Sequence, residues 1–192
     1  MLILVRHGRT EANASRLLQG RRIDPGLDDL GRRQAAALAA TLPAVAHVVA
    51  SPLRRTRETA AAFGRPVDLD ERWIELDYGA LDGTPLSEVP ASLWAAWQAD
   101  IDFRPEGGES LAELGHRVRS AAEEIVEEAG RHDVVVVTHV SPIKAALAWA
   151  LGVGDEVAWR SFVAPASITR VSTAPRRSLH AFNVTAHLDD LS

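Results

Sequence analysis

Three short segments of the chain carry arginine or histidine directly after apolar stretches. They are Arg6-His7-Gly8, Ser51-Pro52-Leu53-Arg54-Arg55 and Thr138-His139. The planar guanidinium group of arginine suits phosphate or carboxylate, and a neutral imidazole is a nucleophile or proton carrier near pH 7. If the apolar stretches are parallel strands of one sheet, the three segments meet at its carboxyl edge, where ligands of open α/β sheets bind. We therefore expect an anion-binding site at that edge.

The apolar stretches themselves predict buried strands. Continuous apolar runs without polar alternation are typical of strands that are covered on both faces. Strands are expected over residues 2–5, 47–50, 67–69, 134–137, 168–171 and 179–184. The four consecutive valines Val134–Val137 give the clearest signal. A turn near Ala174-Pro175 would join the last two strands as an antiparallel edge hairpin.

Helices are expected between these strands. They cover residues 28–41, 51 to about 64, 91–99, 110–130 and 141–151. Ser51 and Ser141 each precede a proline and are expected to be N-caps, with the proline at the first helical position. Their helix N-termini would then add backbone N–H groups to the anion site. Ser110 and Glu113 form a capping-box pattern.

This order of elements predicts an α/β fold. We expect a three-layer αβα arrangement with a mostly parallel central sheet, helices on both faces and the C-terminal edge hairpin. Residues 73–109 interrupt the alternation and hold three of the five tryptophans, so they predict a small inserted cap. Trp94 and Trp97 within it are expected in the core rather than against substrate. The length fits a single domain over residues 1–192.

Composition excludes several classes of function. The chain has no cysteine, which removes disulfides, thiolate zinc sites and cysteine nucleophiles. Its net charge of −5 argues against a nucleic-acid partner, and no run approaches the 18 apolar residues of a membrane span. A cytoplasmic location is therefore expected. Of the 21 basic residues 20 are arginine and one, Lys144, is lysine, so an isolated arginine carries little information here.

The motifs resemble those of the histidine phosphatase superfamily, also called phosphoglycerate mutase-like. Four ordered matches carry the resemblance, which spans residues 2 to about 151. They are Arg6–Asn13 with its Arg-His-Gly start, Ser51–Ala60, Glu75–Gly83 and Thr138-His139. Weaker matches lie at Pro105–Ser110 and around Leu30-Gly31. Arg-His-Gly alone would be a weak signal, but four motifs in the right order make a chance match improbable.

The resemblance implies covalent catalysis of phosphoryl transfer. It assigns the nucleophile to His7, which would form a phosphohistidine, and the proton donor to Glu75. The other ring nitrogen of His7 should then donate to a backbone carbonyl. Gly8 would leave room for backbone beside the phosphate. Glu75 should be buried, because burial favours the protonated carboxyl that gives its proton to the leaving oxygen.

The resemblance also implies the residues that bind the phosphate. They are Arg6, Arg55 rather than Arg54, His139 and the neutral donor Asn13. Their positive charge would offset that of the ester and of the transition state. No step requires a metal or another cofactor. The implied activity is hydrolysis of a small phosphorylated metabolite.

Some alternatives stay open. Each of His7, His139 and Glu75 alone has an ordinary structural explanation, and Val140 stands where the family commonly has glycine. Mutase-type phosphoryl transfer is one alternative activity, although the chain is short for a mutase of this family. A phosphate-binding domain without turnover is another. An exposed edge strand in the C-terminal hairpin could also pair across a two-fold axis to form a homodimer.

Overall fold

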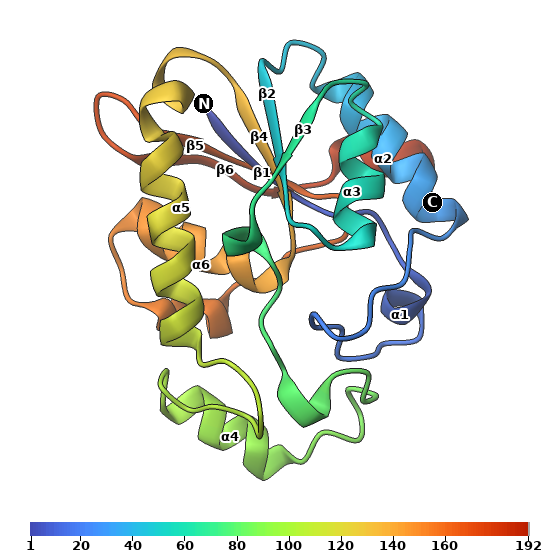
Figure 1. Cartoon of the computed structure of the whole chain (residues 1–192), viewed down its shortest axis with the longest axis vertical. Coiled ribbons are helices and arrows are strands. Elements are labelled where there is room, and N and C mark those ends of the chain that lie inside the picture. Colours follow the sequence, from blue (N-terminus) through green and yellow to red (C-terminus); the bar gives the residue numbers. More distant parts are fainter. Residues whose placement is uncertain (192) are drawn as a thin grey trace.

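The computed structural model describes residues 1–191 and contains one six-stranded sheet in the order β3-β2-β4-β1-β5-β6 (Figure 1). The strands are β1 (Leu2–Arg6), β2 (His47–Ala50), β3 (Val67–Leu69), β4 (Val134–Thr138), β5 (Ile168–Ser172) and β6 (Ser178–Val184). The four strands β1 to β4 pair in parallel. β5 pairs antiparallel with β1, and β6 pairs antiparallel with β5. The expected α/β sheet and its C-terminal edge hairpin are therefore confirmed.

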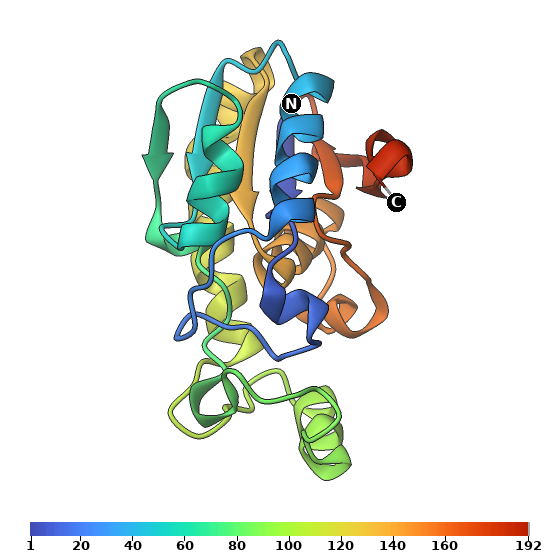
Figure 2. The ribbon, with the colours of Figure 1, turned by 90° about the vertical axis from the view of Figure 1, so that its right-hand side faces the viewer.

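Helices cover both faces of the sheet (Figures 1 and 2). They are α1 (Glu11–Ala14), α2 (Asp29–Thr41), α3 (Arg54–Ala61), α4 (Ala91–Ala99), α5 (Leu111–Arg131) and α6 (Val140–Leu151). The core on one face joins α5 and α6 to the sheet, and the core on the other joins α2 and α3. The three-layer αβα prediction is correct. Among residues 1–191, no helix is long and apolar enough to cross a membrane.

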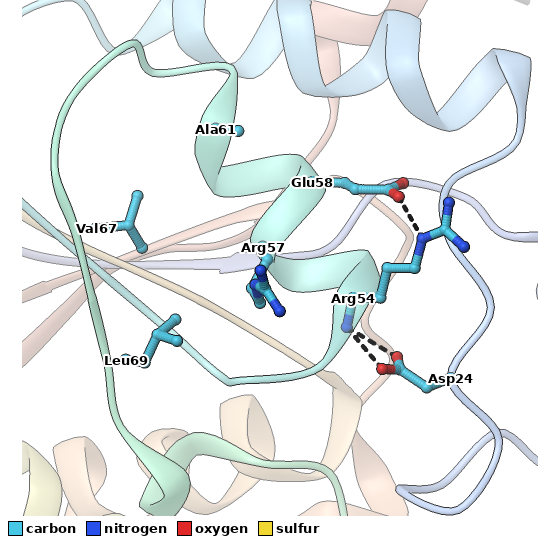
Figure 3. A pocket seen from close by; sticks show the side chains of 7 residues that line it. All are labelled: Asp24, Arg54, Arg57, Glu58, Ala61, Val67 and Leu69. Carbon is cyan, nitrogen blue, oxygen red and sulfur yellow. Dashed lines mark hydrogen bonds and ion pairs between the residues drawn. The ribbon is translucent and has the colours of Figure 1, made fainter.

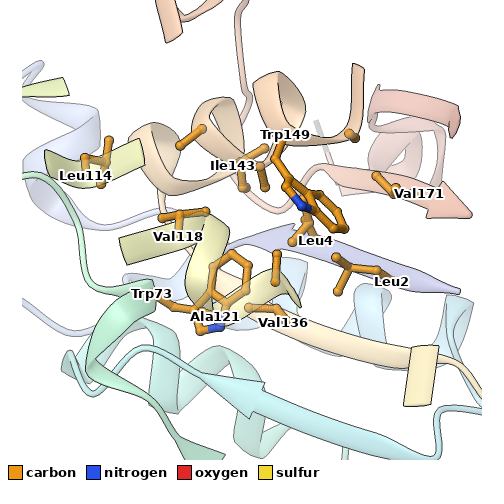
Figure 4. Packing of buried hydrophobic residues seen from close by; sticks show 14 of the residues in the cluster. Leu2, Leu4, Trp73, Leu114, Val118, Ala121, Val136, Ile143, Trp149 and Val171 are labelled. Atoms are coloured by element: carbon orange, nitrogen blue, oxygen red, sulfur yellow. The ribbon is translucent and has the colours of Figure 1, made fainter. Parts of the chain in front are cut away.

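The central strands explain why the sequence has continuous apolar runs. Leu2 and Leu4 of β1 and Val136 of β4 belong to the core under α5 and α6 (Figure 4). Ile3 and Val5, between them in the sequence, belong to the core under α2 and α3. Since successive side chains of a strand point to opposite faces, a strand that is covered twice needs apolar residues at every position.

Two helices begin elsewhere than the Ser-Pro pairs predicted. α3 begins at Arg54 rather than at Ser51, because the Ser51 N–H donates to the Val137 carbonyl (3.0 Å) and keeps the chain extended. α6 begins one residue early, at Val140, and Ser141 is not its N-cap. A carboxylate from the cap satisfies the first N–H groups of α6 instead.

Residues 73–109 form the predicted cap beyond the carboxyl ends of β1 to β4 (Figures 1 and 2). Besides α4 it holds the 3-10 turn Gly79–Leu81, and it begins at the end of another, Glu71–Trp73. Gly79 has φ +58°, and a Cβ there would lie 2.0 Å from the Glu106 carbonyl oxygen. Glycine is therefore required where the two ends of the cap meet.

Candidate active site

Two histidines and two arginines meet at the carboxyl ends of β1 and β4. We call Arg6, His7, Arg55 and His139 the histidine cluster. The His7 N–H donates to the Thr138 carbonyl (3.0 Å), which extends the parallel pairing of β1 and β4 by one residue. The rings of His7 and His139 consequently face each other edge to face, 5.2 Å apart. The prediction that these strand ends converge is correct.

His7 is held as a neutral imidazole with a defined tautomer. It is 3% exposed, and its Nδ1 lies 2.8 Å from the Gly8 carbonyl oxygen. A carbonyl oxygen only accepts hydrogen bonds, so Nδ1 carries the proton and Nε2 keeps its lone pair. Burial lowers the pKa of His7 well below its usual value, and the charges of Arg55 and Arg6 lower it further. The nitrogen left unprotonated is suited to attack an electrophile.

Arg55 is fully buried and is fixed through all three guanidinium nitrogens. Nε donates to His139 Nδ1 (3.2 Å), and the two terminal nitrogens donate to the carbonyls of Gly20 (2.7 Å) and Ile23 (3.3 Å). A carboxylate oxygen of Asp24 lies 3.6 Å from Nη1 of Arg55. A buried guanidinium group held beside the two histidines can bind an anion such as phosphate.

His139 links Arg55 to Ser51. Because its Nδ1 accepts from Arg55, its Nε2 carries the proton and donates to Ser51 Oγ (2.8 Å). Burial lowers the pKa of His139 well below its usual value, and Arg55, His7 and Arg6 lower it further. His139 is therefore neutral in the absence of an anion. This role of Ser51 was not predicted, because the Ser-Pro pair indicated a helix cap.

Arg6 leaves one buried donor unused. One terminal nitrogen donates to the Val163 carbonyl (2.7 Å), while Nε is buried and has no partner among the described residues. Burial lowers the pKa of Arg6 to about 10, an effect that Glu75 opposes. The guanidinium group stays charged at neutral pH, and its free N–H needs an acceptor.

Glu75 joins the cap to the start of α6. It is 3% exposed. Its carboxylate accepts hydrogen bonds from the backbone N–H groups of Leu76 (2.7 Å), Val140 (3.1 Å) and Ser141 (3.2 Å). The expected burial is confirmed. The expectation that free helix N-termini contribute to the anion site is wrong, because Glu75 occupies that of α6 and Asp24 accepts from Arg54 N (2.9 Å) at α3.

Asn13, Gly8 and Arg54 have hydrogen bonds or close contacts outside the histidine cluster. The Asn13 side chain accepts from Thr10 N (3.1 Å) and donates to Gln19 Oε1 (3.0 Å), so both ends of its amide are engaged. Gly8 makes room for a backbone segment of α2, as expected, since a Cβ there would lie 2.4 Å from the Gly31 oxygen. Arg54 is exposed and pairs with Glu58 (2.6 Å).

Two cavities lie near the cluster. One of about 820 Å³ runs along the outer side of α3 (Figure 3). It is lined by charged residues of α3 such as Arg54 and Arg57, and neither histidine lines it. The second, of about 140 Å³, adjoins Glu75 under the cap, and we call it the aromatic cavity. Its lining includes Tyr78, Trp94, Trp97, Lys144 and Trp159. Trp97 belongs to the core, as predicted, and also faces this space.

The chain is similar to a known family along nearly its whole length. The family model of the histidine phosphatase superfamily (branch 1) matches residues 2–185. A bifunctional protein of Mycobacterium tuberculosis is 36% identical over 178 residues, which cover 88% of this chain and 49% of the relative. The chain thus spans about half the length of that relative.

Two further comparisons cover both partners almost fully. Phosphoserine phosphatase 1 of Hydrogenobacter thermophilus is 33% identical over 98% of this chain and 94% of its own length. A solved structure of mycobacterial glucosyl-3-phosphoglycerate phosphatase with VO3 has a TM-score of 0.86 at 30% identity, covering 96% of this chain and 98% of that chain. The sequence relatives and the structural neighbour therefore indicate the same family.

Proposed function

The chain belongs to the histidine phosphatase superfamily, and from this premise we propose that it hydrolyses small phosphomonoesters through a phosphohistidine on His7. The observation that carries the proposal is the histidine cluster itself. A neutral imidazole with a free Nε2 lies among two buried guanidinium groups and a second imidazole. Such a site attracts the anion of a phosphomonoester and offers it a nucleophile.

In the first step Nε2 of His7 attacks phosphorus and the ester P–O bond breaks. Arg6 and Arg55 offset the negative charge of the phosphoryl oxygens, and the unused Nε of Arg6 donates to one of them. Glu75 transfers a proton to the leaving alcohol oxygen. Because the Glu75 carboxylate accepts three backbone N–H groups, we propose that a monoanionic ester brings this proton with it.

His139 responds to the phosphoryl group. Burial and the two arginines keep it neutral. A bound anion opposes these effects and favours the imidazolium form. The added proton comes from solvent and occupies Nδ1, so the Nε–H of Arg55 turns from Nδ1 to a phosphoryl oxygen. The Nε2–H of His139 then exchanges Ser51 Oγ for a phosphoryl oxygen, which supplies a further donor to the transition state.

In the second step water cleaves the phosphohistidine. Glu75, now ionised, accepts a proton from the attacking water, and the N–P bond breaks to release neutral His7. Glu75 passes this proton to the departing phosphate and returns to the carboxylate form. We also propose that Asn13 donates to phosphate, which requires its amide to leave Gln19. Substrate names come from relatives: phosphoserine and glucosyl-3-phosphoglycerate are named for them and support a small phosphorylated metabolite here.

Hydrolysis of 4-nitrophenyl phosphate between pH 5 and 7, in the presence of EDTA, tests this proposal. We expect metal-independent release of phosphate by the wild type and loss of that release in His7→Ala. Equal inertness of both proteins toward a broad panel of phosphomonoesters would refute it. Tight binding of vanadate without turnover would instead favour a phosphate-binding domain. Primer-dependent exchange between 2- and 3-phosphoglycerate would favour a mutase.

The remaining expectations accompany this proposal. We propose that residues 1–192 act as one domain in the cytoplasm, without a nucleic-acid partner. A homodimer through the exposed edge of β6 also stays a prediction. Sedimentation of the purified protein measures its mass in solution and decides between monomer and dimer.

A further inference from the structure

The aromatic cavity begins where the proposed leaving oxygen would lie. Val140 and Ser141, whose N–H groups bind the Glu75 carboxylate, both line it, as does Leu76. The Tyr78 hydroxyl lies 3.3 Å from Ser141 Oγ on the same wall. An alcohol that takes its proton from Glu75 therefore has this cavity as the adjoining buried space.

The walls of the cavity are largely aromatic. Trp94 stacks on Trp97 at 5.7 Å, and Trp159 meets Trp97 edge to face at 6.0 Å. Tyr78 meets Trp97 edge to face at 5.6 Å. The volume of about 140 Å³ is close to that of an engineered apolar cavity of ~150 Å³ that holds benzene. The cavity can thus enclose a group of only about six to eight non-hydrogen atoms.

Two indole groups of these walls lack a hydrogen-bond acceptor. The Nε1 atoms of Trp97 and Trp159 are buried and have no partner among residues 1–191. Trp97 is 1% exposed, so its indole is shielded from bulk solvent. Buried N–H groups in folded proteins are almost always paired. Both N–H groups are therefore available to an acceptor atom of a molecule that enters the cavity.

The only lysine of the chain lies on the same cavity. Lys144 Nζ donates to the Ala158 carbonyl (2.7 Å), and Ala158 also lines the space. No carboxylate of the described residues lies within 4 Å of this ammonium group. An ammonium group has three N–H bonds, so two remain for another acceptor. Burial lowers the pKa of Lys144, Glu75 opposes this shift and Arg6 adds to it.

We infer that the aromatic cavity is a leaving-group pocket in which Lys144 selects phosphomonoesters whose alcohol part is compact and carries a carboxylate. The inference rests on the proposed function, because it names the part of the substrate that leaves phosphorus. The carboxylate pairs with the ammonium group, and the carbon skeleton lies against the aromatic rings. An ester with an uncharged alcohol part of the same size cannot form this ion pair with Lys144.

A purely structural role for Lys144 makes a different prediction. If its ammonium group only stabilises the segment around Ala158, its loss lowers turnover of every substrate alike. If it binds the leaving group, its loss lowers turnover of carboxylate-bearing esters selectively. The ratio of kcat/KM values for two matched esters separates these cases, since a uniform loss cancels in the ratio.

The test compares 2-phosphoglycolate with 2-hydroxyethyl phosphate, which differ by a carboxylate in place of CH2OH. We expect the wild type to prefer 2-phosphoglycolate by about tenfold or more, the usual strength of a hydrogen bond to a charged group. In Lys144→Met this preference should fall about tenfold. Lys144→Gln, which keeps a donor for the Ala158 carbonyl, should lose the preference as well.

Arg160→Met is the matched control. It removes one positive charge from the neighbouring segment, where Arg160 is exposed and outside the cavity lining, and should leave the ratio unchanged. A ratio near one in the wild type, or a ratio that neither Lys144 variant alters, overturns the inference while the phosphatase proposal stands. If the wild type hydrolyses neither ester nor 4-nitrophenyl phosphate, both proposals fail together.

Discussion

The histidine cluster and the aromatic cavity adjoin the same Glu75 carboxylate but are built in different ways. The histidine cluster is positioned by backbone groups: strand pairing places His7 and His139, and backbone carbonyls hold Arg55. The cavity is made by side chains of the cap, of α6 and of the segment after it. Under the proposed function, the chemistry at phosphorus depends on groups held by the sheet, whereas the choice of alcohol depends on replaceable side chains.

The largest effect should come from the nucleophile. His7→Gln should lower kcat for 4-nitrophenyl phosphate by about 10⁴-fold or more, since no other described group occupies its place against phosphorus. His116→Gln, at an exposed position of α5, is the matched control and should stay within about twofold of the wild type. Steady-state kinetics of both variants measure the difference. Comparable activity of His7→Gln and the wild type would show that His7 is not the nucleophile.

Adjacent arginines provide the next largest contrast. Arg55→Ala should lower kcat/KM by about 10² to 10³-fold, because it removes a fixed cation from the phosphoryl site. Arg54→Ala, one residue earlier on the exposed side of α3, should cost less than about threefold. Kinetics with 4-nitrophenyl phosphate compare the two. Similar losses in both variants would show that the net charge of α3, rather than the buried contact with His139, matters.

The cavity should respond more weakly and only to large alcohols. Ala158→Leu fills part of the space with a side chain, so kcat/KM for phenyl phosphate should fall about tenfold. Methyl phosphate, whose alcohol part is one carbon, should be hydrolysed within about twofold of the wild-type rate. Parallel assays with the two esters measure this. Equal losses for both would mean that the cavity does not receive the leaving group.

The smallest effect concerns pH and stability. The pKa values of His7 and His139 are lowered on folding, so below about pH 6.5 the unfolded chain binds more protons than the folded one. The free energy of unfolding should therefore not depend on the titration of these two histidines above about pH 6.5. It should fall as the pH is lowered below about 6.5, by at most about 1.4 kcal/mol per pH unit for each histidine. Urea unfolding at pH 7 and 5.5 measures this. His139→Gln should lose less stability over that interval than the wild type, and an equal loss would contradict the assignment.

Features that depend on local sequence could be predicted, whereas features that depend on contacts between distant segments could not. Val134–Val137 and the capping box at Ser110 depend on local chemistry, and both elements lie where they were expected. The Ser-Pro pairs misplaced the starts of α3 and α6, because long-range partners, the sheet at Ser51 and Glu75 at Ser141, override local capping preferences.

The site divides likewise. The cluster residues could be found because each follows a strand in a recognisable motif. The aromatic cavity could not be predicted, since Trp94, Trp159 and Lys144 meet only through packing between distant segments. Trp97 was predicted to lie in the core, which is correct, but the sequence did not predict that it also lines a cavity. Its place in the lining of the aromatic cavity is seen only in the folded chain.

The most direct measurement is to trap the covalent intermediate. The wild type is mixed with a labelled phosphomonoester, quenched in alkali within milliseconds and digested for mass spectrometry, because phosphohistidine is stable in base and labile in acid. The account predicts one phosphoryl group on the peptide that contains His7, at a level that rises and decays at rates compatible with turnover. Phosphate release without any label on His7, or a label on another residue, would contradict it.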